Sequence, residues 1–582
     1  MWPFSTTERY TTYRPQDLDH QEFDYIVVGG GTGGCVLAAR LSEDPKTRVL
    51  LIERGPIVDT WLSHVPLLSV DFRAASSPTY KWKSTSDNLY QSGESLVAGR
   101  ALGGTSKVNA HVYTRAVPGE YNAWEQAGRK GWGWKSVEPY FKKSETSLTH
   151  KYQSHRGSSG PWHNQKLPDI YFNINDQFLN AADSLGIHRV PDIHDPSTTP
   201  YAAGCFDVTV NEHGNRVSTF DAFLPPTVVN SRRNLFICPS TIVCRLNIES
   251  TPNGLKAAGV YMKPDSTAQG HEEVYVSAKL EVIMCAGAIA TPQILLLSGV
   301  GPSEHLQSLN IPVVKDLPGV GSNLQDHACI PLIYICPRAD TLHELMFSKL
   351  LAIREILKYV FFKRGLLLSP NPQVGLFAVS TLLGDDSRTD QSISGADSHS
   401  PANIPDIEIV PMPFNAFDET QLGPADGVTT VTCMHLKPKS TGTVRLASLD
   451  PLDRPACDLG YLTTPDDYVV FRKMLRLGLE IGRKCREQGY PLRDLRVPLS
   501  EGDKDLDQYI RDRIRTTFHY SCTCRMAPEA EQGVVDDELR VHGIQGLRIA
   551  DASIFPVIPS AHPQTPVVMV AERCADFIKA SI

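Results

Sequence analysis

The sequence has no excess of basic residues, which bears on the partners that the protein can bind. Its 582 residues include 57 Lys and Arg against 65 Asp and Glu, and the formal net charge is −8. Proteins that bind nucleic acids or anionic membranes in a general way carry a basic surface. We therefore expect no nucleic-acid partner and no general attraction to anionic membranes.

Long hydrophobic runs and targeting signals are also scarce. The uncharged stretch 282–302 is interrupted by Thr291-Pro292-Gln293, and its two halves are typical of a buried strand and a short helix, so we expect no membrane span. The N-terminus has no basic segment followed by an apolar one, and the C-terminal K-A-S-I is not the peroxisomal signal S-K-L. These features favour a cytoplasmic location.

Cysteine spacing and metal motifs do not indicate a metalloprotein. The 13 Cys residues have no regular spacing, the close pairs Cys238/Cys244 and Cys522/Cys524 do not match a zinc ribbon, and no H-E-x-x-H motif is present. We expect free thiols in a reducing compartment and no metal site. Gly and Pro number 42 each, too few for a fibrous chain, and no internal repeat is present.

The first positive feature is a strand, a Gly-rich turn, a helix and a second strand within residues 23–53. Gly29-x-Gly31-x-x-Gly34 joins a β-rich run to a helical segment, and Glu53 ends the second strand. Such glycines permit a tight turn and let the backbone approach a pyrophosphate at the helix N-terminus. An acid at the end of the second strand accepts hydrogen bonds from ribose hydroxyls, which favours NAD or FAD over NADP. The sequence therefore predicts a crossover unit that binds a dinucleotide.

A second turn of small residues spans 99–113 and reads G-R-A-L-G-G-T-S-K-V-N-A-H-V-Y. Taken alone, it fits a loop against a flat ring or a phosphate and an ordinary structural loop equally well. Its pattern resembles the first fingerprint of the glucose–methanol–choline (GMC) oxidoreductases, which bind FAD. Residues 287–301 resemble the second fingerprint, and 317–327, L-P-G-V-G-S-N-L-Q-D-H, resemble a further common segment. The resemblance extends from about residue 22 to residue 579.

The resemblance implies noncovalent FAD, because Val108 stands where members with a covalent flavin can carry a His. The residues that it places at the cofactor are Gly29, Gly31, Thr32, Gly33, Gly34, Glu53, Arg54, Trp82, Gly104, Thr105, Asn109, Ala110, His111, Val112, Val243, Asp551, Ala552, Pro563 and Gln564. For two of them an alternative stays open. Core packing explains Trp82 equally well, and a buried structural role suits His111, where many members have an apolar residue.

Two histidines near the C-terminus are the expected catalytic residues. His519 lies in T-T-F-H-Y-S-C-T-C-R-M and His562 in S-A-H-P-Q-T-P, which resemble the segments that carry the family's active-site pair. Oxidation of an alcohol by a flavin needs a base for the hydroxyl proton, and imidazole suits that role at neutral pH. A second polar group orients the hydroxyl and stabilises developing alkoxide character. The resemblance implies that His519 is the base and His562 the orienting partner.

The expected fold is α/β, with a Rossmann-like FAD-binding domain interleaved with an α+β substrate domain on a mostly antiparallel sheet. The expected boundaries are an N-terminal arm at 1–20, FAD-binding segments at 21–160, 225–328 and 541–582, and substrate-domain segments at 161–224 and 329–540. Residues 466–487 are expected to be helical, whereas residues 150–215 have a loop-like composition.

These features predict an FAD-dependent oxidase or dehydrogenase that converts a primary or secondary alcohol to a carbonyl. O2 or another electron acceptor would be the second substrate, and a role in specialised metabolism fits the missing secretion signal. Two other classes stay open: a lyase, cyclase or photodecarboxylase that keeps FAD on the same fold, and a noncatalytic FAD-binding protein. The retained His519/His562 pair argues against photodecarboxylation and against a noncatalytic protein.

Overall fold

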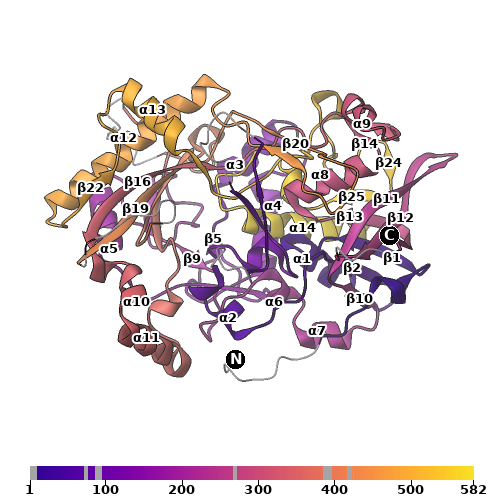
Figure 1. Cartoon of the computed structure of the whole chain (residues 1–582), viewed down its shortest axis with the longest axis horizontal. Helices are drawn as coiled ribbons and strands as arrows, with labels where there is room; N and C mark the ends of the chain where they lie inside the picture. The colour runs from indigo at the N-terminus through magenta and orange to yellow at the C-terminus, as the bar shows by residue number, and fades with distance from the viewer. Residues whose placement is uncertain are drawn as a thin grey trace.

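The computed structural model describes residues 10–70, 77–85, 95–266, 272–384, 396–415, 423 and 425–581. Two large sheets dominate this part of the chain, and they lie on opposite sides of the molecule in Figure 1. Of the expected N-terminal arm, residues 1–9 lie outside the described residues. The remainder of the arm packs on the first sheet, where the N–H of Tyr13 donates to the carbonyl of Ile237 at 2.9 Å.

The first sheet contains the crossover unit that the Gly-rich turn predicts. In spatial order its strands are β10 (Leu235–Cys238), β2 (Val49–Ile52), β1 (Glu22–Val28), β13 (Val274–Met284), β12 (Gly254–Pro264) and β11 (Thr241–Thr251), with β25 (Leu547–Ile549) paired to β13 and β24 (Ile544–Gln545) to β12. Strands β10, β2, β1, β13 and β25 run parallel, whereas β13, β12 and β11 pair antiparallel in turn. Helix α1 (Thr32–Leu41) connects β1 to β2 and packs against the C-terminal helix α14 (Gln564–Ala580).

The second sheet is antiparallel throughout its described pairs. Its strands are β22 (Arg493–Arg496), β16 (Ala328–Pro337), β19 (Asp426–His435), β18 (Ile407–Met412), β17 (Val374–Ala378) and β8 (Ala202–Cys205), with β23 (Arg515–Thr516) paired to β16. Helices α12 (Pro465–Glu487) and α5 (Asn173–Ser184) contact each other and this sheet. The expected helix at 466–487 and the expected α/β architecture, with segments of the two sheets alternating along the chain, are confirmed.

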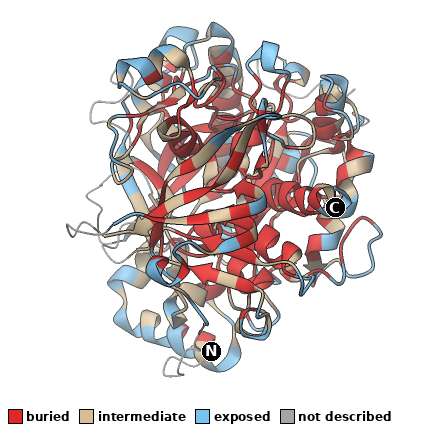
Figure 2. Ribbon diagram, turned by 90° about the vertical axis from the view of Figure 1, so that its right-hand side faces the viewer, coloured by how far each residue is buried: buried red, intermediate tan, exposed pale blue. Residues whose placement is uncertain are grey.

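The two faces of the second sheet meet different surroundings, and the alternation of side chains along the strands separates them. Along β18, Ile407 and Ile409 belong to the core beneath the helices, whereas Val410 and Met412 line a large cavity. The same switch occurs on β19 between Cys433 and its neighbour Met434. Successive side chains of a strand point to opposite faces, so one face of this sheet forms a wall of the cavity. Figure 2 shows the buried residues running through both sheets and the central helices.

The loop-like expectation for residues 150–215 is wrong for part of this stretch. It contains helix α5, with Ile174, Phe178 and Leu179 buried, as well as short strands. The apolar residues of α5 stand among Asn and Asp residues, which have low helix propensity. The packing of the helix against α12 and the second sheet outweighs that local preference.

The other helices and strands surround the two sheets. The helices are α2 (Trp61–His64), α3 (Pro118–Gln126), α4 (Trp134–Ser144), α6 (Thr219–Phe223), α7 (Pro226–Ser231), α8 (Gly287–Leu297), α9 (Ser303–Ser308), α10 (His343–Phe347), α11 (Lys349–Phe362) and α13 (Asp503–Arg513). The strands are β3 (Thr79–Lys83), β4 (Ser95–Gly99), β5 (Val112–Tyr113), β6 (Glu145–Ser147), β7 (Trp162–Lys166), β9 (Asp207–Val208), β14 (Val300–Gly301), β15 (Lys315–Asp316), β20 (Thr443–Arg445) and β21 (Ala456–Asp458). The uncharged stretch 282–302 forms the end of β13, helix α8 and β14, which are largely buried. Among the described residues, no helix combines the length and the hydropathy that a membrane crossing requires.

Candidate active site

A cavity of about 2120 Å³ is lined by residues of both sheets, and it gathers nearly all of the residues expected from the sequence. The lining includes every expected cofactor residue except Gly34, together with His519 and His562. These residues come from segments between 29 and 564, so the interleaved topology is what brings them together. Gly34 lies inside α1, immediately behind the Gly-rich turn.

The glycines of the 29–34 turn have two different physical roles. A Cβ on Gly34 would lie 1.9 Å from the carbonyl oxygen of Gly29, and a Cβ on Gly33 would lie 2.4 Å from that of Ala550. Both positions therefore need glycine for packing of α1 against its neighbours. A Cβ on Gly31 would meet its nearest atom, the carbonyl oxygen of Cys285, at an ordinary 3.7 Å. Gly31 caps the N-terminus of α1 at the cavity wall, where backbone N–H groups favour an anion.

Glu53 directly follows β2 and links the first Gly-rich turn to the segment after this strand. Its carboxylate accepts hydrogen bonds from the N–H groups of Gly30 at 2.9 Å and Gly55 at 2.7 Å. Burial raises the pKa of Glu53 to about 7, and the two N–H donors act in the opposite direction. Each carboxylate oxygen retains a lone pair beyond the bond that it already accepts. Hydroxyl donors from a ribose would therefore complete the hydrogen bonding of this buried group.

A hydrogen-bond network fixes the second turn against the start of α14. The Nδ2 of Asn109 donates to Oε1 of Gln564 at 2.9 Å, and Nε2 of Gln564 donates to the carbonyl of Val112 at 2.5 Å. The fully buried Arg216 donates from Nη2 to Oδ1 of Asn109 at 2.5 Å. These contacts hold the 109–112 backbone rigidly at the cavity wall, as a site for a planar ring requires.

His111 belongs to this turn, but its ring is directed into the protein. Its side chain is buried, both ring nitrogens lack a hydrogen-bond partner among the described residues, and its φ is +48°. Burial, followed by repulsion from Arg216, lowers the pKa of His111 well below its usual value. Its burial agrees with the structural role that the sequence left open, but His111 also lines the cavity, so its contact with the cofactor stays a prediction. Trp82 packs on the second core and also lines the cavity, so its contact with the cofactor stays a prediction.

The two expected catalytic histidines meet at the cavity wall. Their ring centroids are 5.0 Å apart, with the rings inclined at 62°. Nδ1 of His519 lies 2.9 Å from Nδ1 of His327, and Nε2 of His562 lies 3.0 Å from Oε1 of Glu408. These contacts leave Nε2 of His519 and Nδ1 of His562 as the ring nitrogens for a ligand.

The surroundings of His519 favour the neutral form of its imidazole. Burial is the largest cause that lowers the pKa of His519 well below its usual value, and repulsion from His562 and His327 adds to it. No carboxylate contacts the His519 ring among the described residues, whereas the buried carboxylate of Glu408 contacts His562. Nε2 of His519 therefore carries a lone pair that can accept a proton.

Backbone hydrogen bonds position the loop that carries His519. Its N–H donates to Oδ1 of Asp326 at 2.7 Å, and Asp326 also accepts hydrogen bonds from Thr516 and Tyr461. Burial raises the pKa of Asp326 to about 6, against the effect of these donors. Asp326 therefore positions the backbone of His519.

Three of these residues were not predicted to belong to the site. Asp326 and His327 end the common segment 317–327, so this segment could have been used to predict that both residues belong to the site. Glu408 has no such signal, because it lies in a strand that is otherwise apolar, I-E-I-V-P-M. Only the pairing of β18 with β19 brings its carboxylate to His562.

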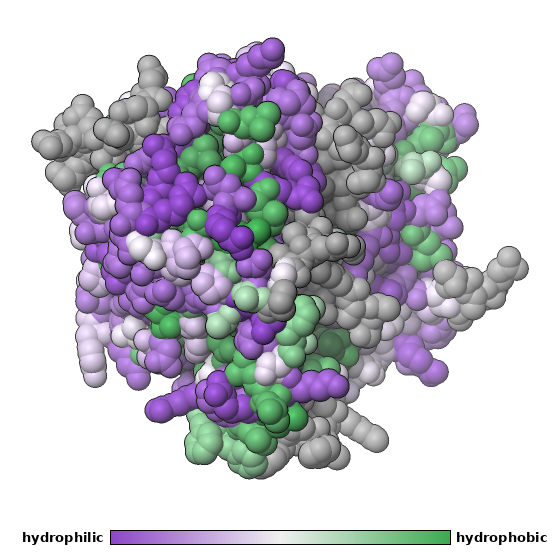
Figure 3. Space-filling model, turned by 60° about the vertical axis from the view of Figure 1, so that its left-hand side comes forward, coloured by the Kyte–Doolittle hydropathy of each residue, from purple (hydrophilic) through white to green (hydrophobic). Residues whose placement is uncertain are grey.

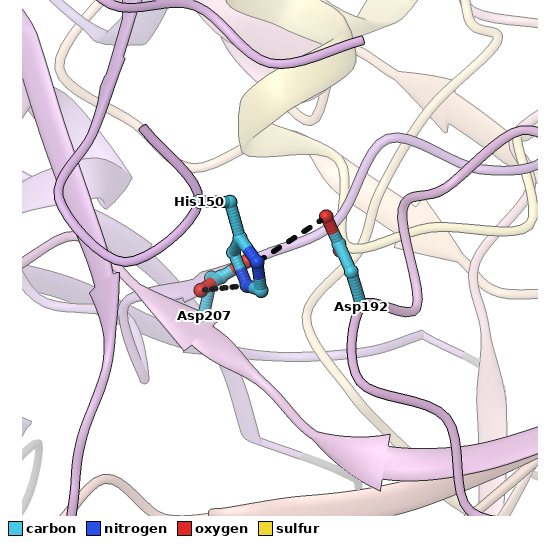
Figure 4. A group of neighbouring side chains, drawn as sticks. All are labelled: His150, Asp192 and Asp207. Carbon is cyan, nitrogen blue, oxygen red and sulfur yellow. Dashed lines mark ion pairs between the residues drawn. The ribbon is translucent and has the colours of Figure 1, made fainter. Parts of the chain in front are cut away.

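A separate group of charged side chains lies outside the cavity lining (Figure 4). His150, Asp192 and Asp207 have potential ligand atoms within 4.8 Å of one another, a spacing that suits a metal ion. However, Nη1 of Arg156 lies 2.9 Å from a carboxylate oxygen of each aspartate. The buried guanidinium already supplies the positive charge that the carboxylates need, so this group is explained as a structural ion-pair network.

The cysteines form no bonds with one another in the structure. All thirteen are free thiols, and twelve of them are buried. Cys522 and Cys524 lie in the loop after His519, and burial raises the pKa of both thiols. They are therefore poor nucleophiles at neutral pH and contribute to packing.

The GMC oxidoreductase family model matches residues 23–329 with its N-terminal part and residues 438–571 with its C-terminal part. The chain belongs to the GMC oxidoreductase family. This GMC oxidoreductase is 34% identical to dehydrogenase str4 of Strobilurus tenacellus, over 96% of the chain and 94% of that protein. It is also 34% identical to the mitochondrial choline dehydrogenase of Mus musculus, over 96% of the chain and 89% of that protein.

Solved structures of related proteins have the same fold. An FAD-dependent oxidoreductase from Chaetomium thermophilum superimposes with a TM-score of 0.82 at 28% identity, covering 96% of this chain and 99% of that one. The chain is therefore an FAD-dependent oxidoreductase of the class that acts on CH–OH donors. The glycines of the 29–34 turn and the buried carboxylate of Glu53 fit FAD at this site.

Proposed function

We propose that this GMC oxidoreductase oxidises a primary or secondary alcohol to a carbonyl, with His519 as the base. The observation that carries this proposal is the contrast between the two histidines: His519 is held neutral and contacts His327, whereas His562 contacts the carboxylate of Glu408. A neutral imidazole accepts a proton, and the Glu408 carboxylate holds His562 through Nε2, so that Nδ1 of His562 is the nitrogen left for the substrate oxygen.

Each residue then has a distinct task. Bound FAD would supply the hydride-accepting chemistry for this oxidation. Nε2 of His519 takes the hydroxyl proton, while Nδ1 of His562 orients the same oxygen and stabilises its developing negative charge. Glu408 holds His562 through Nε2, and Asp326 holds the backbone of His519. Both histidines line the cavity from parts of the chain that the second sheet and the C-terminal segment fix in place.

The wall opposite the cofactor residues indicates the kind of alcohol. Val410, Met412, Phe414 and Met434 line the cavity from β18, β19 and the segment after β18. Such a wall removes an apolar surface from water, which favours an alcohol with an apolar body over a small polar one. We place this reaction in the cytoplasm and in specialised metabolism. O2 or another electron acceptor would reoxidise the flavin. The similarity to dehydrogenase str4 of Strobilurus tenacellus supports a dehydrogenase role.

An anaerobic screen over a panel of alcohols tests this function. We expect at least one alcohol with an apolar body to bleach the yellow flavin absorbance, and admission of air to a reduced sample then separates an oxidase from a dehydrogenase. A substrate that is converted to product while the flavin stays oxidised would instead support the lyase or cyclase alternative.

We predict that the FAD is bound noncovalently. Val108 lines the cavity where a histidyl link could form, and the ring nitrogens of the nearby His111 are buried in the protein. Cys285 also lines the cavity, but burial raises the pKa of its thiol well above the usual value. Acid precipitation should therefore release the flavin into the supernatant. Flavin that remains with the washed precipitate would contradict this prediction.

Replacing Glu53 with glutamine should weaken FAD binding by roughly 10- to 150-fold, because hydrogen bonds to a charged group contribute about 1.5–3 kcal/mol. Glu53→Gln keeps the volume of the side chain but replaces one acceptor oxygen with an NH2 group, which cannot accept a hydrogen bond from Gly30, Gly55 or a ribose hydroxyl. Titration of FAD into apoprotein, followed by flavin fluorescence, measures the dissociation constant. If mutant and wild type bound FAD equally well, Glu53 would not contact the cofactor.

A further inference from the structure

An exposed apolar patch lies on the helical hairpin of α10 and α11, at one edge of the molecule in Figure 1. Met346 is 79% exposed, Leu350 84% and Phe361 60%, and these are large side chains that a protein surface rarely leaves in water together. In Figure 3 hydrophobic residues gather at the lower end of this face, with hydrophilic residues beside them.

The spacing of the apolar residues shows that they form one face of α11. Leu350, Ile353, Leu357 and Phe361 follow one another at intervals of three or four residues and are all exposed. Glu355 and Tyr359 are buried on the opposite side, where Tyr359 packs on a small core. The most hydrophobic face of helix α11 is therefore exposed to solvent, whereas a helix on the surface of a protein usually buries that face.

Basic residues are frequent on the same hairpin, and helical spacing puts Lys349, Arg354 and Lys358 beside this apolar face. Between residues 343 and 364 the chain has five basic residues, Lys349, Arg354, Lys358, Lys363 and Arg364, against two acidic ones, Glu344 and Glu355. Glu355 is already neutralised, because it contacts both Arg354 and Lys358, and Glu344 pairs with Arg338. The hairpin is thus locally positive on a chain whose net charge is −8.

We propose that the α10–α11 hairpin docks this protein onto the surface of an anionic lipid bilayer. The exposed Leu and Phe side chains would enter the boundary of the acyl chains, and the bordering Lys and Arg residues would meet the lipid phosphates. This binding is peripheral, since α11 spans only Lys349–Phe362 and is too short to cross a bilayer. The overall negative charge does not oppose it, because screening confines attraction to charges within about 10 Å of the lipid.

The charge on the hairpin favours an anionic lipid surface over a second copy of the chain as the partner. A symmetric dimer through the same face would bring the basic border of one copy against that of the other, and like charges repel. An anionic surface instead satisfies both the apolar face and its basic border. The hairpin adjoins Leu342, which lines the cavity, so docking would place one wall of the cavity near the lipid.

Vesicle co-sedimentation of the FAD-loaded protein tests the proposal. We expect binding to phosphatidylcholine vesicles that contain about 30% phosphatidylserine, and binding at least about tenfold weaker to phosphatidylcholine alone or at high salt. The double variant Leu350→Glu/Phe361→Glu should lose at least about tenfold in binding to the anionic vesicles. The double variant Lys349→Glu/Arg364→Glu should also bind the anionic vesicles more weakly than the wild type does.

A matched variant controls for the loss of exposed leucines in general. Leu449 and Leu499 are 57% and 96% exposed and lie outside the hairpin, so Leu449→Glu/Leu499→Glu should bind vesicles as the wild type does. FAD content and circular dichroism establish that each variant is folded. Three results would overturn the proposal: equal binding to neutral and anionic vesicles, unchanged binding of the Leu350/Phe361 variant, or a dimer in light scattering that this variant dissociates while no vesicle binding occurs.

Discussion

Replacing His519 with alanine should slow anaerobic reduction of the flavin by about 10²- to 10⁴-fold, which corresponds to roughly 3–5 kcal/mol of activation free energy. The variant removes the imidazole that takes the hydroxyl proton, whereas the apolar wall that binds the body of the alcohol is untouched. Substrate binding should therefore change far less than the rate. Rapid-mixing spectroscopy of the FAD-loaded variant at several alcohol concentrations measures both quantities.

The second histidine provides the internal control for this assignment. His562→Ala should also reduce the rate, and the double variant should lose less than the product of the two single losses, because both side chains act on one hydroxyl. His188→Ala is the control variant, because the exposed His188 pairs with Asp183 and lies outside the site. Its rate of flavin reduction should equal that of the wild type. A His519→Ala enzyme that reduced its flavin within a few-fold of wild type would remove His519 as the base.

Substituting Gly34 with alanine should destabilise the protein by about 1–3 kcal/mol or more, because a methyl group cannot be accommodated without a backbone shift. The new Cβ would lie 1.9 Å from the carbonyl oxygen of Gly29. Thermal unfolding of the apoprotein should show a clear decrease in Tm.

Gly31→Ala is the matched variant with the opposite signature. Its Cβ meets no protein atom closer than 3.7 Å but occupies the surface that faces the cavity. The Tm of the apoprotein should be unchanged, while FAD affinity should fall roughly 10- to 150-fold as hydrogen bonds to the pyrophosphate are lost. Equal Tm for Gly34→Ala and wild type, or equal FAD affinity for Gly31→Ala and wild type, would contradict the roles assigned to these glycines.

The cofactor side of the site was predictable because its chemistry imposes local patterns. A pyrophosphate at a helix N-terminus requires closely spaced glycines, and Gly29, Gly33 and Gly34 each meet backbone where a Cβ would not fit. The antiparallel second sheet was also expected, and the structure confirms it. The glycine pattern is local, because it depends on residues that are neighbours in the chain, whereas the second sheet was expected from the family resemblance.

The remainder depended on contacts between distant segments. Helix α5 was missed because tertiary packing, not local propensity, stabilises its polar sequence. Glu408 was missed because nothing near it in the chain indicates that strand pairing will bring it to His562, which is 154 residues away. The exposure of the apolar face of α11 could not be predicted, because its sequence alone is consistent with a core helix. Only the structure shows which face of the helix is buried.

The pH dependence of anaerobic flavin reduction, compared between wild type and His519→Ala, tests the central claim most directly. Because the pKa of His519 is held well below its usual value, the wild-type base is neutral throughout the neutral and alkaline range. Its reduction rate constant should therefore be flat from about pH 7 to about pH 9 and fall only in acid, with an apparent pKa that belongs to the histidine pair. In His519→Ala the proton must pass to solvent, so the rate should rise with pH over the same range. A wild-type rate that rises about tenfold per pH unit between about pH 7 and about pH 9, parallel to that of the variant, would contradict His519 as the base.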